Sequence, residues 1–161
     1  MLLYIQKMKG DFEIMKIWFD MDGTIANLYG VTDWLPMLIA SDPTPYAIAK
    51  PLCNLSLFAR YVNRLQKMGH EVGIISWLSK SSTPEYDAMV TSAKMFWLSH
   101  HLPSVKWDEI KITPYGVNKW ETCGEGILFD DEEPNRRTWG DRAYKPDEIF
   151  TILSQLCKEV A

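Results

Sequence analysis

The heptapeptide Trp18-Phe19-Asp20-Met21-Asp22-Gly23-Thr24 decides the interpretation of this 161-residue sequence. It closes an apolar run, residues 14–19, with two carboxylates that a single residue separates. Such a run of β-branched and aromatic residues predicts a buried strand. Because Gly23 lets the chain leave the strand, both carboxylates can point into one cleft, where one attacks an electrophile while the other moves protons.

Further apolar runs predict three more strands, at residues 72–75, 109–113 and 127–129. Continuous apolarity, in place of strict alternation, is typical of a sheet that is covered on both faces. Helical periodicity predicts helices at residues 55–68, 83–101 and 147–159. This order predicts an α/β fold, a doubly wound, Rossmann-like parallel sheet with helices on both faces.

Local signals mark the ends of the first two helices. Asn54 is the expected N-cap of the first helix and Gly69 its stop. The dipeptide Thr83-Pro84 supplies an N-cap and a proline at the first helical position of the second. The buried face of that second helix is expected to contain Tyr86, Met89, Val90, Ala93 and Trp97.

Residues 25–53 are the long irregular insertion of this sequence. This length suits two short helices or a hairpin but not an independent domain, so it predicts a small cap, or lid, after the first strand. Its aromatic residues Tyr29 and Trp34 either stack on a ligand or anchor the lid to the core. We expect one domain over residues 15–161, preceded by an N-terminal extension, residues 1–14.

Composition excludes several classes of function. The sequence has 17 Lys+Arg and 21 Asp+Glu, a formal net charge of −4, which argues against binding to duplex nucleic acid. Cys53, Cys123 and Cys157 lie too far apart for a zinc knuckle or a disulfide framework. The sequence contains no apolar run long enough to cross a membrane. We therefore expect a cytoplasmic protein without a membrane partner.

Polar, reactive side chains follow every predicted strand. Ser76 follows the second strand, Lys119 comes shortly after the third, and Asp130-Asp131 follow the fourth. Active sites of doubly wound sheets lie beyond the carboxyl ends of the strands. The sequence therefore predicts that these residues meet Asp20 and Asp22 at one edge of the sheet.

Together and in this order, the motifs resemble those of the haloacid dehalogenase superfamily of aspartate-nucleophile phosphotransferases. Residues 18–24 resemble its first motif, and the second, third and fourth are matched by Ser76, Lys119 and Asp130-Asp131. Residues 94–98 with Pro103, and residues 127–131 with Pro134-Asn135, look like the 5'(3')-deoxyribonucleotidase branch. That branch usually has a longer cap and often carries Thr-Ser where this sequence has Ser76-Trp77.

The resemblance implies a phosphomonoester hydrolase that forms an aspartyl-phosphate on Asp20, with Asp22 as the general acid and base. Ser76 is then expected to hydrogen-bond a phosphoryl oxygen, and Lys119 to neutralise charge. Lys94 competes for the role of Lys119 unless it lies on a solvated helix face. The residues expected to bind the substrate are Thr24, Trp77, Lys94, Tyr29 and Trp34.

A cation is implied by the charge of the predicted site. At an effective dielectric constant of about 20, two carboxylates about 4 Å apart repel each other by about 4 kcal/mol, and four surround the phosphate here. Ligands that are all oxygen favour Mg2+ over zinc. The expected ligands are Asp20, the backbone carbonyl of Asp22, and either Asp130 or Asp131.

The expected substrate is a small phosphorylated metabolite, with a nucleotide as the first candidate and a sugar or other organic phosphate as the alternative. Two other classes compete, a phosphate-accepting domain of the receiver type and a catalytically silent binding domain. In receiver domains the acidic pair follows the first strand, and the aspartate that accepts the phosphate comes in mid-chain. In this sequence the motif Asp20-Met21-Asp22-Gly23-Thr24 comes first and the acidic pair Asp130-Asp131 comes last. The presence of every catalytic position argues against a silent domain.

Overall fold

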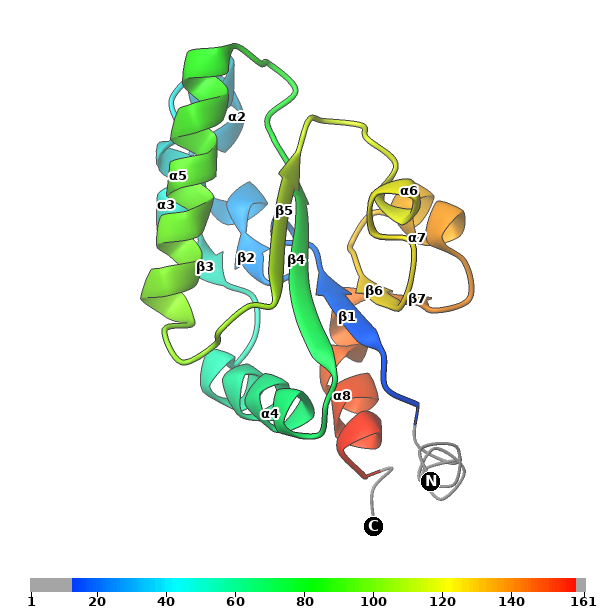
Figure 1. Ribbon diagram of the computed structural model, residues 1–161. Coiled ribbons are helices and arrows are strands. Elements are labelled where there is room, and N and C mark those ends of the chain that lie inside the picture. Colours follow the sequence, from blue (N-terminus) through cyan, green and yellow to red (C-terminus); the bar gives the residue numbers. More distant parts are fainter. Residues whose placement is uncertain (1–12, 159–161) are drawn as a thin grey trace.

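The computed structural model describes residues 13–158, and its centre is a five-stranded sheet (Figure 1). The strand order is β5-β4-β1-β6-β7, and all four pairings are parallel. The strands are β1 (Lys16–Phe19), β4 (Glu71–Trp77), β5 (Glu109–Thr113), β6 (Ile127–Phe129) and β7 (Ala143–Tyr144). The four predicted strands are confirmed, whereas β7 has only two residues and leaves no apolar run that a sequence pattern could detect.

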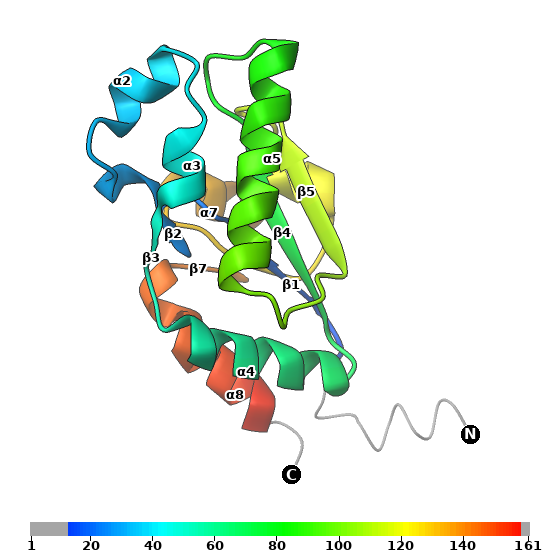
Figure 2. The same cartoon turned by 90° about the vertical axis from the view of Figure 1, so that its left-hand side faces the viewer.

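Both faces of the sheet are buried, since side chains on the two faces of β1 pack into different apolar clusters. Ile17 and Phe19 pack into the larger cluster, and Trp18 packs with Trp139 in a smaller one on the other face. The larger cluster lies under α4 (Leu55–Lys67), α5 (Pro84–His101) and α8 (Ile149–Lys158), and the smaller lies under α7 (Glu133–Trp139) (Figure 2). This arrangement confirms the predicted α/β, Rossmann-like sheet with helices on both faces.

The predicted helix signals operate as expected at the start of α4 and α5. Asn54 Oδ1 accepts a hydrogen bond from the backbone N–H of Leu57, and Thr83 Oγ1 accepts one from that of Tyr86. Each bond satisfies one of the backbone donors that a helix leaves free in its first turn. The third predicted helix is divided into η2 (Pro146–Glu148) and α8, and its expected last residue, at position 159, lies outside the described residues.

The predicted buried face of α5 is wrong at one position. Met89 is 43% exposed, whereas the other four expected residues, Tyr86, Val90, Ala93 and Trp97, are buried. Lys94 is fully buried on this helix, so its interpretation as part of a solvated face is also wrong. A lysine is tolerated there because its ammonium group reaches three oxygen acceptors.

The insertion segment, residues 25–53, folds against α5 as a small layer. Its ends pair as a two-stranded antiparallel ladder of β2 (Ala26–Asn27) and β3 (Lys50–Pro51). Between them lie η1 (Leu28–Gly30) and the two short helices α2 (Trp34–Ile39) and α3 (Thr44–Ile48). Tyr46 of α3 packs with Tyr86 and Val90 of α5 in a third apolar cluster, which anchors the segment to the rest of the fold.

Short elements account for the other differences from the predictions. Lys119, expected in a turn, is the first residue of α6 (Lys119–Cys123), and Asn118 caps this helix by accepting a hydrogen bond from Glu121 N–H.

Within residues 13–158, no helix combines the length and apolar character needed to cross a membrane. Residues 1–12 of the predicted extension lie outside the described residues, and its residue Glu13 forms an exposed ion pair with Arg142.

Candidate active site

The topology of the sheet places a crevice at the carboxyl ends of β1 and β6. From β1 the chain proceeds to β4 and β5 on one side, then returns to the other side of β1 for β6 and β7. Such a reversal leaves a crevice where the connections diverge, the usual binding site of open α/β sheets. Asp20 directly follows β1, and Asp130 directly follows β6.

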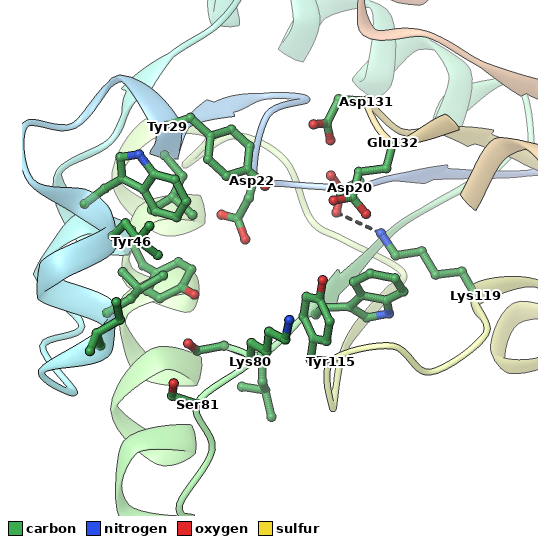
Figure 3. Close-up of a pocket in the computed structure, with 18 residues that line it drawn as sticks. Asp20, Asp22, Tyr29, Tyr46, Lys80, Ser81, Tyr115, Lys119, Asp131 and Glu132 are labelled. Carbon is green, nitrogen blue, oxygen red and sulfur yellow. Dashed lines mark hydrogen bonds and ion pairs between the residues drawn. The ribbon is translucent and has the colours of Figure 1, made fainter. Parts of the chain in front are cut away.

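A cavity of about 490 Å³ opens at this edge of the sheet (Figure 3). Carboxylates from the ends of β1 and β6 and the lysine at the start of α6 lie at one end, and aromatic rings from the insertion segment and from the loop after β5 lie around the rest. The predicted site residues that line this cavity are Asp20, Asp22, Tyr29, Trp34, Trp77, Lys119 and Asp131. The fold therefore collects most of the predicted residues around one space.

Asp20 is held by two side chains from different parts of the chain. Lys119 Nζ donates to Asp20 Oδ1 at 2.9 Å, and Thr24 Oγ1 donates to Asp20 Oδ2 at 3.0 Å. The backbone N–H of Asp20 donates to the carbonyl of Phe129, so the sheet itself fixes this residue. Both oxygens of the predicted nucleophile thus have a defined direction.

Thr24 and Gly23 bring the fourth motif to the first. The backbone N–H of Asp131 donates to Thr24 Oγ1 at 3.1 Å, so one hydroxyl joins the two acidic segments. Gly23 has φ +80°, and a Cβ atom at this position would overlap the carboxylate of Asp131 and approach the ring of Tyr29 to 2.9 Å. Only glycine combines that backbone conformation with so close an approach.

Asp130 and Asp131 have different surroundings. Asp130 is fully buried, and its Oδ2 accepts from Lys119 Nζ at 2.6 Å and from Asn135 Nδ2 at 3.2 Å, while its Oδ1 accepts from Glu132 N–H. Asp131 is only partly buried and lines the cavity. Asp130 therefore positions Lys119, and Asp131 is the carboxylate that faces the cavity.

Asn135 and Arg136 support the fourth motif, although the sequence analysis assigned them no role. Arg136 Nη1 donates to the carbonyl of Asp130 at 3.0 Å and to that of Asp131 at 2.8 Å. These bonds fix the turn that separates the two carboxylates. The only signal in the sequence was the dipeptide Pro134-Asn135, and it indicated a family resemblance without indicating a contact.

A second lysine holds Asp22 from behind the cavity wall. Lys94 Nζ donates to Asp22 Oδ2 and Ser76 Oγ at 2.7 Å each and to the carbonyl of Trp77 at 2.6 Å. Lys94 and Ser76 are both fully buried, and neither lines the cavity. The structure therefore assigns one lysine to each carboxylate of the first motif, Lys119 to Asp20 and Lys94 to Asp22.

Burial and mutual repulsion dominate the electrostatics of the site. Burial raises the pKa of Asp22, and the charge of Lys94 offsets only part of this rise. Burial and the negative charge of Asp20 raise the pKa of Asp130 and Asp131. Burial lowers the pKa of Lys119, but Asp20 and Asp130 outweigh that effect, so its pKa lies above the usual value and the ammonium stays charged.

The carboxylates that crowd this site fit a divalent cation. One oxygen each from Asp20, Asp130 and Asp131 lies within 4.8 Å of the others. Lys119 supplies a single positive charge among these groups, which leaves an excess of negative charge. Hard oxygen donors in this number suit Mg2+ better than zinc. The residues present are therefore compatible with the magnesium that the sequence implies.

Several residues that line the cavity are not among the predicted site residues, and some of them come from loops at the ends of strands. Tyr115 lies in the loop after β5, and Lys80 lies in the loop after β4 (Figure 3). Residues in such loops lack the periodicity that identifies helices and strands. Comparisons with known proteins add no assignment, since no protein-family model and no curated protein matches this sequence.

Proposed function

We propose that this chain is a magnesium-dependent phosphomonoester hydrolase of the haloacid dehalogenase type, which forms an aspartyl-phosphate on Asp20. One observation carries the proposal. Asp20 and Asp22 face a single cavity, yet each is bound by its own buried lysine. The two carboxylates therefore have different surroundings, as a nucleophile and a proton carrier require.

In the first step, a carboxylate oxygen of Asp20 attacks the phosphorus atom and the ester P–O bond breaks. The leaving oxygen takes a proton from Asp22, whose raised pKa favours the protonated form. Lys119 remains charged and lies against Asp20, so it stabilises the negative charge of the phosphoryl group during transfer.

In the second step, water attacks the phosphorus atom of the aspartyl-phosphate. Asp22, now a carboxylate, accepts a proton from this water, and the bond between phosphorus and Asp20 breaks. Inorganic phosphate leaves, and both carboxyl groups return to their starting protonation states. The sum of the two steps is hydrolysis of one phosphomonoester to an alcohol and phosphate.

Asp20, Asp131 and the backbone carbonyl of Asp22 would hold the magnesium ion, while Asp130 keeps Lys119 in place. When bound, the ion supplies positive charge that reduces repulsion between the carboxylates and an incoming phosphate. Thr24 contributes by fixing the separation of Asp20 from Asp131.

A nucleotide is the proposed substrate, with a sugar or other organic phosphate as the alternative. The cavity of about 490 Å³ has the volume of a small-molecule site, which supports a low-molecular-weight phosphate ester. Its aromatic lining supports a substrate with a flat, apolar part. The insertion segment contributes Tyr29 and Trp34 to this lining and is the proposed lid.

Phosphate release from a panel of phosphorylated metabolites tests the proposal. Asp20→Asn should lower turnover by at least about 1,000-fold, because an amide cannot attack phosphorus. Asp22→Asn should slow proton transfer and allow the phosphoenzyme to accumulate, which mass spectrometry of the acid-quenched protein detects. Asp141→Asn makes the same chemical change at an exposed position and should have wild-type activity. A folded Asp20→Asn protein with a tenth of wild-type activity would exclude the covalent mechanism.

A further inference from the structure

Two aromatic rings form one wall of the cavity, on the side where the sheet lies. Trp77 ends β4, and Tyr115 follows β5; their ring centroids are 5.0 Å apart, with 56° between the ring planes. Tyr115 is 51% exposed, and it lines the cavity together with Asp20. We call this pair the aromatic shelf.

The shelf is fixed by the backbone around it. The indole N–H of Trp77 donates to the carbonyl of Val117 at 2.9 Å. Val117 N–H donates to the carbonyl of Pro114, and Gly116 between them has φ +85°. This is the pattern of a type II turn, which places Tyr115 at its first central position. The Trp77 ring and the backbone of Tyr115 are therefore held in place before a ligand arrives.

The shelf extends from the phosphate end of the cavity outward. Lys119 Nζ, which binds Asp20, lies 5.0 Å from the centroid of the Trp77 ring. Lys80 Nζ lies 5.9 Å from the centroid of the Tyr115 ring. A phosphate held at Asp20 and Lys119 thus places its ester group beside Trp77, and the next part of the substrate reaches Tyr115.

The opposite wall of the cavity differs from the shelf. Tyr29 and Trp34 of the insertion segment meet edge to face, with centroids 4.9 Å apart and 76° between the ring planes. Figure 3 shows Tyr29 across the cavity from Tyr115. The ring of Tyr29 also lies close to Gly23, so Tyr29 contacts the loop that carries the catalytic carboxylates. Tyr29 and Tyr115 are similarly exposed, at 46% and 51%, and the feature that distinguishes Tyr115 is the ammonium group of Lys80 beside its ring.

We infer that the aromatic shelf is the leaving-group subsite and that Tyr115 is its specificity-determining residue. Its ligand is a nucleobase, the planar aromatic part of a nucleoside monophosphate, which stacks on the Tyr115 ring. This inference rests on the proposed function, because that function fixes where the phosphate lies. A half-exposed ring at the outer end of a cavity, with a cation beside it, is the kind of surface on which bases stack.

The test compares three substrates and four proteins. Turnover of adenosine and thymidine 5'-monophosphate is measured beside that of glycerol 3-phosphate, which has no ring. The proteins are wild type, Tyr115→Ala, Tyr115→Phe and Phe96→Ala. Phe96 is the matched control, because it is 53% exposed and lies on α5, and it is not part of the cavity lining.

Tyr115→Ala should lower kcat/KM for both nucleotides by about 5- to 150-fold and change that for glycerol 3-phosphate less than about twofold. Tyr115→Phe keeps the ring and should retain nucleotide turnover, as should Phe96→Ala. Two results with Tyr115→Ala would overturn the subsite: equal losses on all substrates, or no loss on any of them. A wild-type protein that hydrolyses glycerol 3-phosphate but neither nucleotide would overturn it as well.

A binding measurement separates the subsite from the proposed function. Calorimetric titration of Asp20→Asn, with and without Tyr115→Ala, gives the affinity for adenosine 5'-monophosphate without turnover. If the wild type hydrolyses no phosphomonoester but Tyr115→Ala still weakens nucleotide binding, the proposed function fails and the aromatic shelf stands as a nucleotide-binding site without a leaving-group role. If neither turnover nor nucleotide binding is found, both are overturned.

Discussion

Lys94→Met should strongly destabilise the fold, because it leaves buried oxygen atoms without their donor. The ammonium group is fully buried and donates three hydrogen bonds of 2.6 to 2.7 Å, one of them to the carboxylate of Asp22. Removing one partner of a buried ion pair costs about 3 to 5 kcal/mol. For a chain of this size, that loss lowers the melting temperature by roughly 6 to 20 °C. Methionine has a similar length, so little of the loss comes from packing.

Urea unfolding followed by circular dichroism measures the free energy of unfolding of each variant. Lys16→Met is the control, since Lys16 also binds a carboxylate, that of Glu109 at 2.9 Å, but its side chain is 27% exposed. Pairs of this kind contribute up to about 1 kcal/mol. The double variant Asp22→Asn/Lys94→Met should recover about 1 kcal/mol or more of the loss, because it removes the uncompensated charge. A loss below about 1 kcal/mol in Lys94→Met would refute the reasoning.

Three further predictions concern turnover and the start of the chain. Chelation should abolish phosphate release and Mg2+ should restore it, while Ca2+ should inhibit because its larger, looser coordination shell misplaces the reacting groups; full activity in excess chelator contradicts this. Lys119→Met should lower kcat more than Lys94→Met, since only Lys119 touches Asp20; the opposite order would move the phosphate lysine into α5. A chain that begins at Met15 should keep its free energy of unfolding within about 1 kcal/mol, because Glu13 contributes only an exposed ion pair; insoluble protein would show that the removed residues matter for the core.

Strands could be predicted wherever burial on both faces leaves a continuous apolar run. The runs at residues 109–113 and 127–129 have the same limits as β5 and β6. β7 has two residues and α6 has five, so neither is long enough to show a period. Such elements are stabilised by contacts with distant parts of the chain, and a local pattern does not contain that information.

The candidate site could be predicted where each strand delivers a reactive side chain to the same edge. Asp20 and Asp131 come together as expected because β1 and β6 are parallel neighbours, and Lys119 reaches Asp20 from the start of α6. The burial of Lys94 could not be predicted from helical periodicity, since its acceptor Asp22 lies 72 residues away in the sequence. Tyr115 was not predicted because a single aromatic residue in a turn has no repeating neighbour.

The central position of β1 has a consequence for synthesis of the chain. Lys16 pairs in register with Glu71, 55 residues later, and Ile17 pairs with Ile127, 110 residues later. At a synthesis rate of about 5 to 20 residues per second, these partners emerge roughly 3 to 11 s and 6 to 22 s after β1. During that interval the apolar residues of β1 are open to other unfinished chains. A ribosome-associated chaperone that covers this segment should therefore raise the yield of native protein more than one that acts after release.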